Sequence, residues 1–162
     1  MGKIIGLVVA LLLGFGIYRG CFYQSPSYLI YLKWAQAARD GDCSTLYALA
    51  DGDAKKWVDS YCTPSGGMTI MGTVSPGVAA AAMVSELRNT PQGSMMHFHH
   101  ELESEDEAAD GTIQLSAIES VMARATAHFK PAGPHRQILK LKHEGETWKV
   151  LDYKDVEVPE SK

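Results

Sequence analysis

The sequence predicts an α+β domain behind an N-terminal transmembrane helix, and three observations lead to this prediction. Residues 4–18 form an apolar run without charge, IIGLVVALLLGFGIY. From residue 28 onward, apolar side chains recur at three- and four-residue steps, which is typical of amphipathic helices. In the last third of the chain the period changes to two, which is typical of β-strands. The 162 residues are enough for one domain beyond this anchor.

The first 23 residues are expected to be an uncleaved membrane anchor. A helix over residues 4–23 would be about 30 Å long, at roughly 1.5 Å per residue, and would span the hydrocarbon if Arg19 snorkels to the interface. Aromatic residues at its end would mark the membrane surface, as interfacial belts do: Tyr18, Phe22 and Tyr23.

Two other interpretations of this segment compete with the anchor. A cleaved signal peptide would need an A-x-A-like site of small residues, and no such site follows the run. A lipoprotein signal is suggested by Gly20-Cys21, but Tyr18 and Arg19 do not fit the lipid-attachment motif. The retained anchor is therefore favoured, and membrane lipid is an expected partner.

Small residues line one edge of the expected span. Gly14, Gly16 and Gly20 are its candidate helix-packing residues, and the spacing of Gly16 and Gly20 lets two transmembrane helices approach closely. This favours integral membrane protein subunits as partners.

Two cysteines bear on the compartment. Cys43 and Cys62 lie at opposite ends of a predicted pair of helices. If they meet they form a disulfide, which places the domain outside the cytoplasm; the alternative is two buried free thiols. We expect a single-pass protein of a bacterial inner membrane with its soluble domain in the periplasm.

Four helices are predicted in the first half of the soluble part. Residues 24–27 are expected to form a polar hinge, and Pro26 or Ser27 starts the first helix, which Asp40-Gly41-Asp42 stops. Shorter helices are expected over 44–50 and 54–61 and, after a loop over 63–76, another over 77–88.

Strands are predicted from residue 97 to the end of the domain. They cover 97–103, 112–118, 121–129, 135–143 and 147–158, and an acidic solvated turn joins the first two. The last two form a hairpin, with Leu139, Leu141, Trp148 and Val150 on one face. The expected division of the chain is an anchor over 1–23, a hinge over 24–27, a domain over 28–158 and a tail over 159–162.

Two segments carry a family resemblance. YLKWAQAARDGDCSTLYALAD at 31–51 and ILKLKHEGETWKVLDYKDVEV at 138–158 resemble the start and the closing hairpin of the NTF2-like superfamily, in particular its small bacterial DUF4878-type and lumazine-binding-like members. The resemblance implies a cone in which helices pack on a curved antiparallel sheet and enclose a pocket. Some members catalyse isomerase or dehydratase reactions, others bind ligands, and many assemble with partners.

Catalytic members of that superfamily carry a buried Asp with Tyr, or His with Asp, in the pocket. No such set is identified in this sequence. Asp152 and Tyr153 are adjacent on the last strand, so they alternate faces and do not both point inward. The chain is therefore expected to have no catalytic residues and no cofactor, although enzyme activity is left open.

Two histidines are candidate metal ligands. His97 and His99 share a face of one predicted strand, as pairs of zinc or copper ligands do, and Glu101 falls on the same face. The other interpretation is a partly exposed polar strand.

Charge excludes one class of partner. With Lys3 and Arg19 in the anchor region set aside, 13 basic and 19 acidic residues remain, so binding to nucleic acid is not expected.

The first functional hypothesis is a non-catalytic accessory or scaffolding subunit of a larger inner-membrane complex, with respiratory or photosynthetic assemblies as natural hosts. The second is a membrane-tethered ligand-binding protein or enzyme that uses the pocket.

Overall fold

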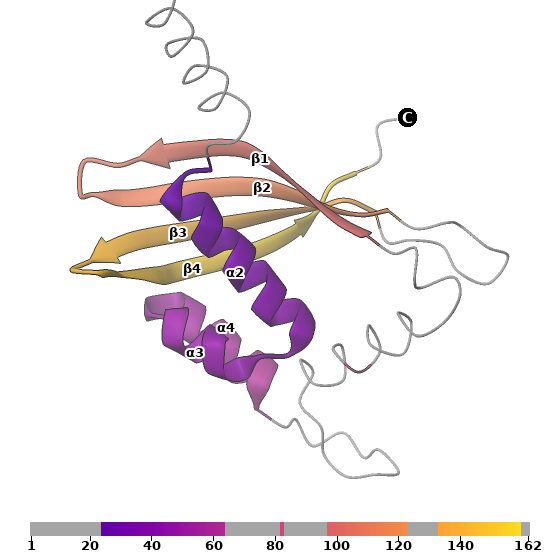
Figure 1. Ribbon diagram of the computed structural model, residues 1–162, viewed down its shortest axis with the longest axis horizontal. Helices are drawn as coiled ribbons and strands as arrows, with labels where there is room; N and C mark the ends of the chain where they lie inside the picture. Colours follow the sequence, from indigo (N-terminus) through magenta and orange to yellow (C-terminus); the bar gives the residue numbers. More distant parts are fainter. Residues whose placement is uncertain (1–23, 64–81, 83–96, 123–132, 160–162) are drawn as a thin grey trace, which may run out of the picture.

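Three helices pack on one face of a four-stranded antiparallel sheet in the computed structural model (Figure 1). The structure describes residues 24–63, 82, 97–122 and 133–159. Within these residues, α helices come first and strands follow, so the predicted α+β class is confirmed. No helix in the described part of the chain is long and apolar enough to cross a membrane. The anchor over 1–23 lies outside the described residues and stays a prediction.

The first helix, α2, covers Pro26–Asp40 and is delimited by local signals in the sequence. The Ser25 hydroxyl accepts a hydrogen bond from the backbone N–H of Tyr28 at 3.2 Å and caps the helix. Gly41 ends the helix in the left-handed conformation, with φ of 65°, which glycine adopts at little cost. The helix buries a stripe against the sheet: Tyr28, Tyr31, Trp34, Ala35 and Ala37.

The two shorter helices also begin where aspartates can cap them. Helix α3 covers Cys43–Leu49 and α4 covers Gly52–Cys62. The Asp42 side chain accepts from the Thr45 N–H at 3.1 Å, and the Asp51 side chain accepts from the Gly52 N–H at 2.8 Å. Asp40-Gly41-Asp42 therefore separates α2 from α3 as the sequence predicts, and α4 begins at Gly52, two residues before its predicted start at 54.

The sheet is a meander of four antiparallel strands in sequence order. Strand β1 covers His97–Glu107, β2 Thr112–Met122, β3 His135–Glu144 and β4 Thr147–Glu157. The predicted closing hairpin is present, with Glu144 paired to Thr147 and Gly145 at φ of 63° in the turn. A register shift at Lys140/Leu141 marks a bulge in this hairpin.

Two strand predictions need correction. The sequence predicts a turn in the acidic segment after residue 103, but β1 continues to Glu107, past a bulge between Leu102 and Ser104. Charged residues are tolerated there because β1 is an edge strand with water on one side. Strand β2 runs without a break to Met122, so a separate strand does not begin at Val121. The remainder of that expected strand, and the expected helix over 77–88 apart from Ala82, lie outside the described residues.

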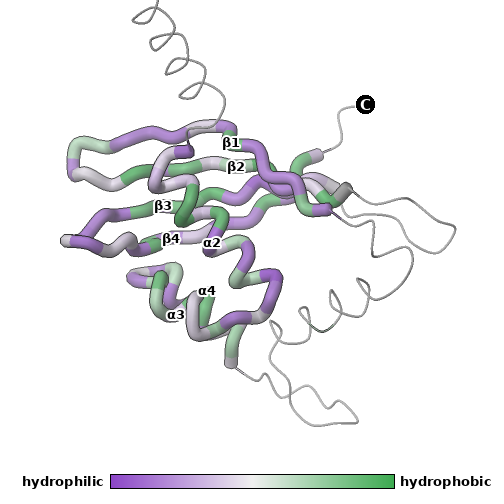
Figure 2. Tube along the Cα trace, in the orientation of Figure 1, coloured by the Kyte–Doolittle hydropathy of each residue, from purple (hydrophilic) through white to green (hydrophobic). Residues whose placement is uncertain are grey.

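The hydrophobic core lies between the helices and the inner face of the sheet. The sheet contributes residues without exposed surface at its centre, among them Leu115, Leu139, Leu141 and Val150. These apolar positions alternate with polar ones along β3 (Figure 2). Trp148, expected on the same face, is only partly buried, and its ring packs against His143 at 4.9 Å between centroids.

Side-chain hydrogen bonds connect the start of α2 to β1. Ser25 Oγ donates to Glu105 Oε2 at 2.7 Å, and Ser27 Oγ donates to Glu105 Oε1. Ser27 is also buried. Of the four residues assigned to the hinge, Ser25 therefore caps the helix, and Pro26 and Ser27 lie in its first turn.

Candidate functional site

A cavity of about 220 Å³ lies between α2, α4 and the inner face of the sheet. The two helices and all four strands contribute to its wall. Its lining residues are Ala35, Ala38, Arg39, Trp57, Tyr61, Phe98, Glu119, Gln137, Tyr153 and Asp155. Because the elements that meet here are distant in sequence, the cavity depends on the assembled fold.

One side of the cavity is aromatic. The Trp57 ring stacks on Tyr61, with centroids 4.7 Å apart, and meets Tyr153 edge to face at 4.6 Å. Such contacts between rings add to the stability that burial provides. Burial raises the pKa of the Tyr153 phenol, so this ring remains neutral. Tyr61 also donates a hydrogen bond to the Ala38 carbonyl oxygen, which ties α4 to α2.

The other side carries a largely buried ion pair. Arg39 Nη1 lies 3.0 Å from Glu119 Oε2 and 2.7 Å from His100 Nε2. The guanidinium carbon is 4.5 Å from the centre of the Phe98 ring, a cation–π contact. Arg39 is thus held by three partners on β1 and β2, and its orientation is set by the sheet.

The partners of His100 determine its tautomer. Arginine only donates hydrogen bonds, so Nε2 accepts from Arg39, and the ring proton of the neutral histidine lies on Nδ1. Nδ1 is 2.8 Å from the Tyr31 hydroxyl and 3.5 Å from Glu119 Oε2. Burial and the neighbouring Arg39 charge lower the pKa of His100 to about 4. The imidazole therefore positions its neighbours in its neutral form.

Glu119 and Gln137 are acceptors at the cavity wall. Burial raises the pKa of the Glu119 carboxyl, with Asp155 adding to the rise, and Arg39 opposes this shift. Gln137 is only 6% exposed, and its Oε1 has no hydrogen-bond partner among the described residues. A buried acceptor without a partner costs about 1–3 kcal/mol.

The candidate metal ligands, His97 and His99, lie outside the cavity. His97 and His99 are exposed, on the face of β1 opposite to His100. No group of three or more histidine, cysteine or acidic side chains suited to a metal occurs in the described ranges. The neighbouring His100, which the sequence analysis does not select, lies with Phe98 on the inner face. The alternation along 97–100 is the signal that could have separated the two pairs.

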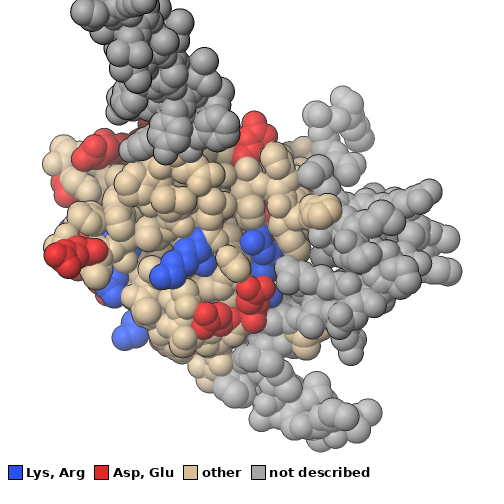
Figure 3. Space-filling model, in the orientation of Figure 1, with Lys and Arg blue, Asp and Glu red and all other residues tan. Residues whose placement is uncertain are grey.

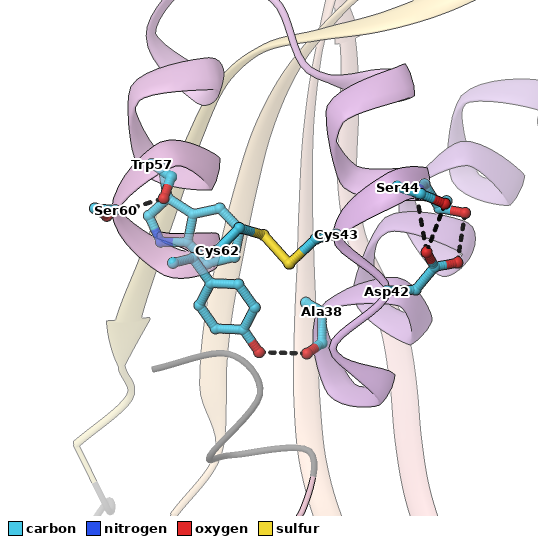
Figure 4. The surroundings of a disulfide bond; sticks show 9 residues. Ala38, Asp42, Cys43, Ser44, Trp57, Ser60 and Cys62 are labelled. Atoms are coloured by element: carbon cyan, nitrogen blue, oxygen red, sulfur yellow. Dashed lines mark hydrogen bonds between the residues drawn. A yellow bond between two sulfur atoms is a disulfide. The ribbon is translucent and has the colours of Figure 1, made fainter. Parts of the chain in front are cut away.

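The structure joins Cys43 and Cys62 by a disulfide, which links the start of α3 to the end of α4 (Figure 4). Of the two alternatives considered, bonded or free, the bonded pair is the one present. The Cα atoms are 5.9 Å apart, within the usual range for a bridge.

Tyr153, expected to share no face with Asp152, lines the cavity. Asp152 instead pairs with Lys154 at 3.5 Å. Gly14, Gly16 and Gly20 lie outside the described residues.

Charges on the helical face are mixed. Lysine and arginine side chains lie beside aspartates and glutamates over the helices, and the described part of this face has no continuous basic surface (Figure 3).

Comparison with known proteins yields structural similarity without a sequence match. No protein-family model matches the chain, and no curated protein sequence matches it. Among solved structures, the chain is similar to Aln2 from a Streptomyces species, with 13% sequence identity and a TM-score of 0.43. The match covers 83% of this chain and 93% of that chain.

Protonation of His100 is expected to destabilise the domain in acid. In the unfolded chain its pKa is near 6.5 and in the folded protein about 4, so between these values the unfolded state binds more protons. Stability from this group is present above pH 6.5 and is lost as the pH falls toward 4. The raised pKa of Glu119 works in the opposite direction: its contribution is present in acid and is lost as the pH rises.

A His100→Gln variant isolates the contribution of the histidine. Its unfolding free energy should change less than that of the wild type across this pH range, as measured by urea unfolding at several pH values. His143→Gln, at an exposed position on β3, is the matched control and should retain the wild-type slope. Equal slopes for wild type and His100→Gln would show that His100 does not contribute.

Proposed function

We propose that this chain is a membrane-tethered ligand-binding protein whose binding site is the cavity between α2, α4 and the sheet. The observation that carries the proposal is Gln137, a buried amide whose Oε1 lacks a partner among the described residues. A ligand N–H or O–H that reached this oxygen would offset the cost of burying it. The NTF2-like assignment belongs to the same proposal, and the support for it is a cavity between helices and one sheet face.

The contacts of His100 favour a positioning role for this histidine over proton transfer. Both ring nitrogens of His100 already have partners, Tyr31 and Arg39, so the lone pair on Nε2 is engaged. The Glu119 carboxylate is paired with the Arg39 guanidinium. A general base would need a lone pair that faces its substrate.

The proposed location is the periplasmic face of a bacterial inner membrane. Two features support it: the apolar run over residues 4–18 and the Cys43–Cys62 disulfide, because disulfides persist in oxidising compartments. The tether would hold the cavity near the membrane surface.

Indole is a suitable probe for this proposal, since it is flat, neutral and carries one N–H donor. Titrated into the full-length protein in nanodiscs, indole should give saturable NMR shifts of the Gln137 side-chain amide and of cavity residues. The Ala38→Phe variant, which fills the cavity wall from α2, should abolish these shifts. Gln36→Phe places the same ring on the exposed side of α2 and should leave them intact. Identical shifts in Ala38→Phe and in the wild type would exclude this site.

A second candidate function is the accessory subunit of an inner-membrane complex. The observation that favours it is the outer face of the sheet, which none of the described helices covers (Figure 1). By register, Ile118, Arg136 and Val156 form a row across β2, β3 and β4, and Val156 is 49% exposed. Arg136, in the middle of this row, pairs with Glu103 at 2.7 Å, so the uncovered face offers a partner a mixture of apolar and charged side chains.

Co-migration tests this second candidate. Native membranes would be solubilised in mild detergent, separated on a native gel, and the chain located by mass spectrometry. Migration with a large complex in fixed proportion supports the accessory subunit. Migration of the chain alone, or as a small dimer, contradicts it.

A further inference from the structure

We propose that the cavity selects a small organic cation, an amine that is protonated at neutral pH and is attached to a flat apolar group. This inference rests on the proposed ligand-binding function and adds the chemical class of the ligand. Its basis is the juxtaposition, at one wall, of three oxygen acceptors from neighbouring strands with a set of aromatic rings.

The acceptors lie close together because of the sheet register. Gln137 on β3 is paired directly with Asp155 on β4, so their side chains share the inner face and are neighbours. Glu119 projects from the same face of β2 and lines the same cavity. A primary ammonium group has three N–H donors, which matches a set of convergent oxygens.

The aromatic side supplies a surface that suits the rest of such a ligand. Trp57 packs against Tyr61 at a centroid distance of 4.7 Å and against Tyr153 at 4.6 Å. The faces of these rings carry negative electrostatic potential, so they attract a cation as well as a flat apolar group. A cavity of about 220 Å³ fits a single-ring ligand.

The charge balance of the lining favours a cation over an anion. Glu119 and Asp155 are acidic, and Arg39 is the one basic residue in the described lining. Arg39 is already engaged with Glu119 and His100 through the same nitrogen and lies over the Phe98 ring. Asp155 is contacted by His135 Nδ1 at 3.0 Å through Oδ1. Arg39 therefore balances the charge of Glu119 through Oε2, and the partly exposed Asp155 carboxylate, which His135 contacts through one oxygen, carries the charge that would compensate a ligand.

Three probes of matched shape and different charge test the inference: benzylamine, benzyl alcohol and benzoate. They are titrated into the full-length protein in nanodiscs at neutral pH and followed by the NMR signals of cavity residues. Benzylamine should bind tightest and benzoate weakest. Asp155→Asn preserves volume and should weaken benzylamine about tenfold, with little change for benzyl alcohol, because a charge-assisted hydrogen bond is lost. Asp152→Asn, on the same strand beside Lys154, is the matched control and should change neither affinity.

The outcomes separate the ligand class from the site itself. If benzoate binds as tightly as benzylamine, or if Asp155→Asn weakens amine and alcohol equally, the cation inference is wrong while ligand binding stands. If none of the three probes and no indole binds, the proposed function fails as well.

Discussion

Replacement of Trp34 by Ala is expected to lower the free energy of unfolding by about 3–5 kcal/mol, the range for loss of a large buried side chain. Trp34 has no exposed surface, and its ring lies 5.6 Å from both Trp57 and Tyr153. It therefore connects α2 to the aromatic wall of the cavity. Urea unfolding followed by far-UV circular dichroism measures the change without relying on tryptophan fluorescence.

A second variant at this position separates packing from hydrogen bonding. Trp34 Nε1 is buried and has no partner among the described residues. Trp34→Phe removes this donor and preserves much of the ring, so it should cost well under half as much as Trp34→Ala. Leu29→Ala, at an exposed position on the same helix, should change stability by no more than about 0.5 kcal/mol. A Phe variant as unstable as the Ala variant would contradict this account.

Removal of the disulfide is expected to have the second large effect. The Cys43→Ser/Cys62→Ser double variant should lose about 3 kcal/mol, since the bridge restricts the unfolded chain by joining two residues at a sequence separation of 19. The bond also joins α3 and α4, two short helices that bury few residues of their own.

Chemical reduction provides an independent check on that result. Wild-type protein unfolded with a thiol reductant should match the double variant. A Cys21→Ser variant, which retains both bridge cysteines, should remain as stable as the wild type. Equal stability of reduced and oxidised wild type would show that the bridge contributes nothing.

Local signals predict the helices well. The start of α2 at Pro26 and its end at Asp40-Gly41-Asp42 are indicated by a few adjacent residues, whereas the capping roles of Ser25, Asp42 and Asp51 are seen only in the structure. The closing hairpin is predictable for the same reason, with Gly145 in its turn. Strand β1 is harder to predict. The charged residues at 103–107 indicate exposure to solvent, and such exposure is equally compatible with a turn and with an edge strand.

The candidate site could not be assembled from sequence spacing. Arg39 is 61 residues from His100 and 80 from Glu119. Nothing in the chain near any one of them indicates the others. The same holds for Gln137, which resembles an ordinary strand residue until its burial is known. What the sequence does contain is the alternation of Phe98 and His100 with His97 and His99, which decides which histidine faces inward.

The acidic half of β1 has a consequence for how copies of this protein behave at high concentration. Edge strands are templates for aggregation, because unpaired backbone groups can recruit a strand from another molecule. Here the edge is occupied by Glu103, Glu105, Asp106 and Glu107. Glu103 is compensated by its ion pair with Arg136, so the repulsion between two copies that dock edge to edge on β1 comes from Glu105, Asp106 and Glu107, and it opposes the pairing. The charge that suggests a solvated turn thus protects the sheet from fibrous growth along that edge.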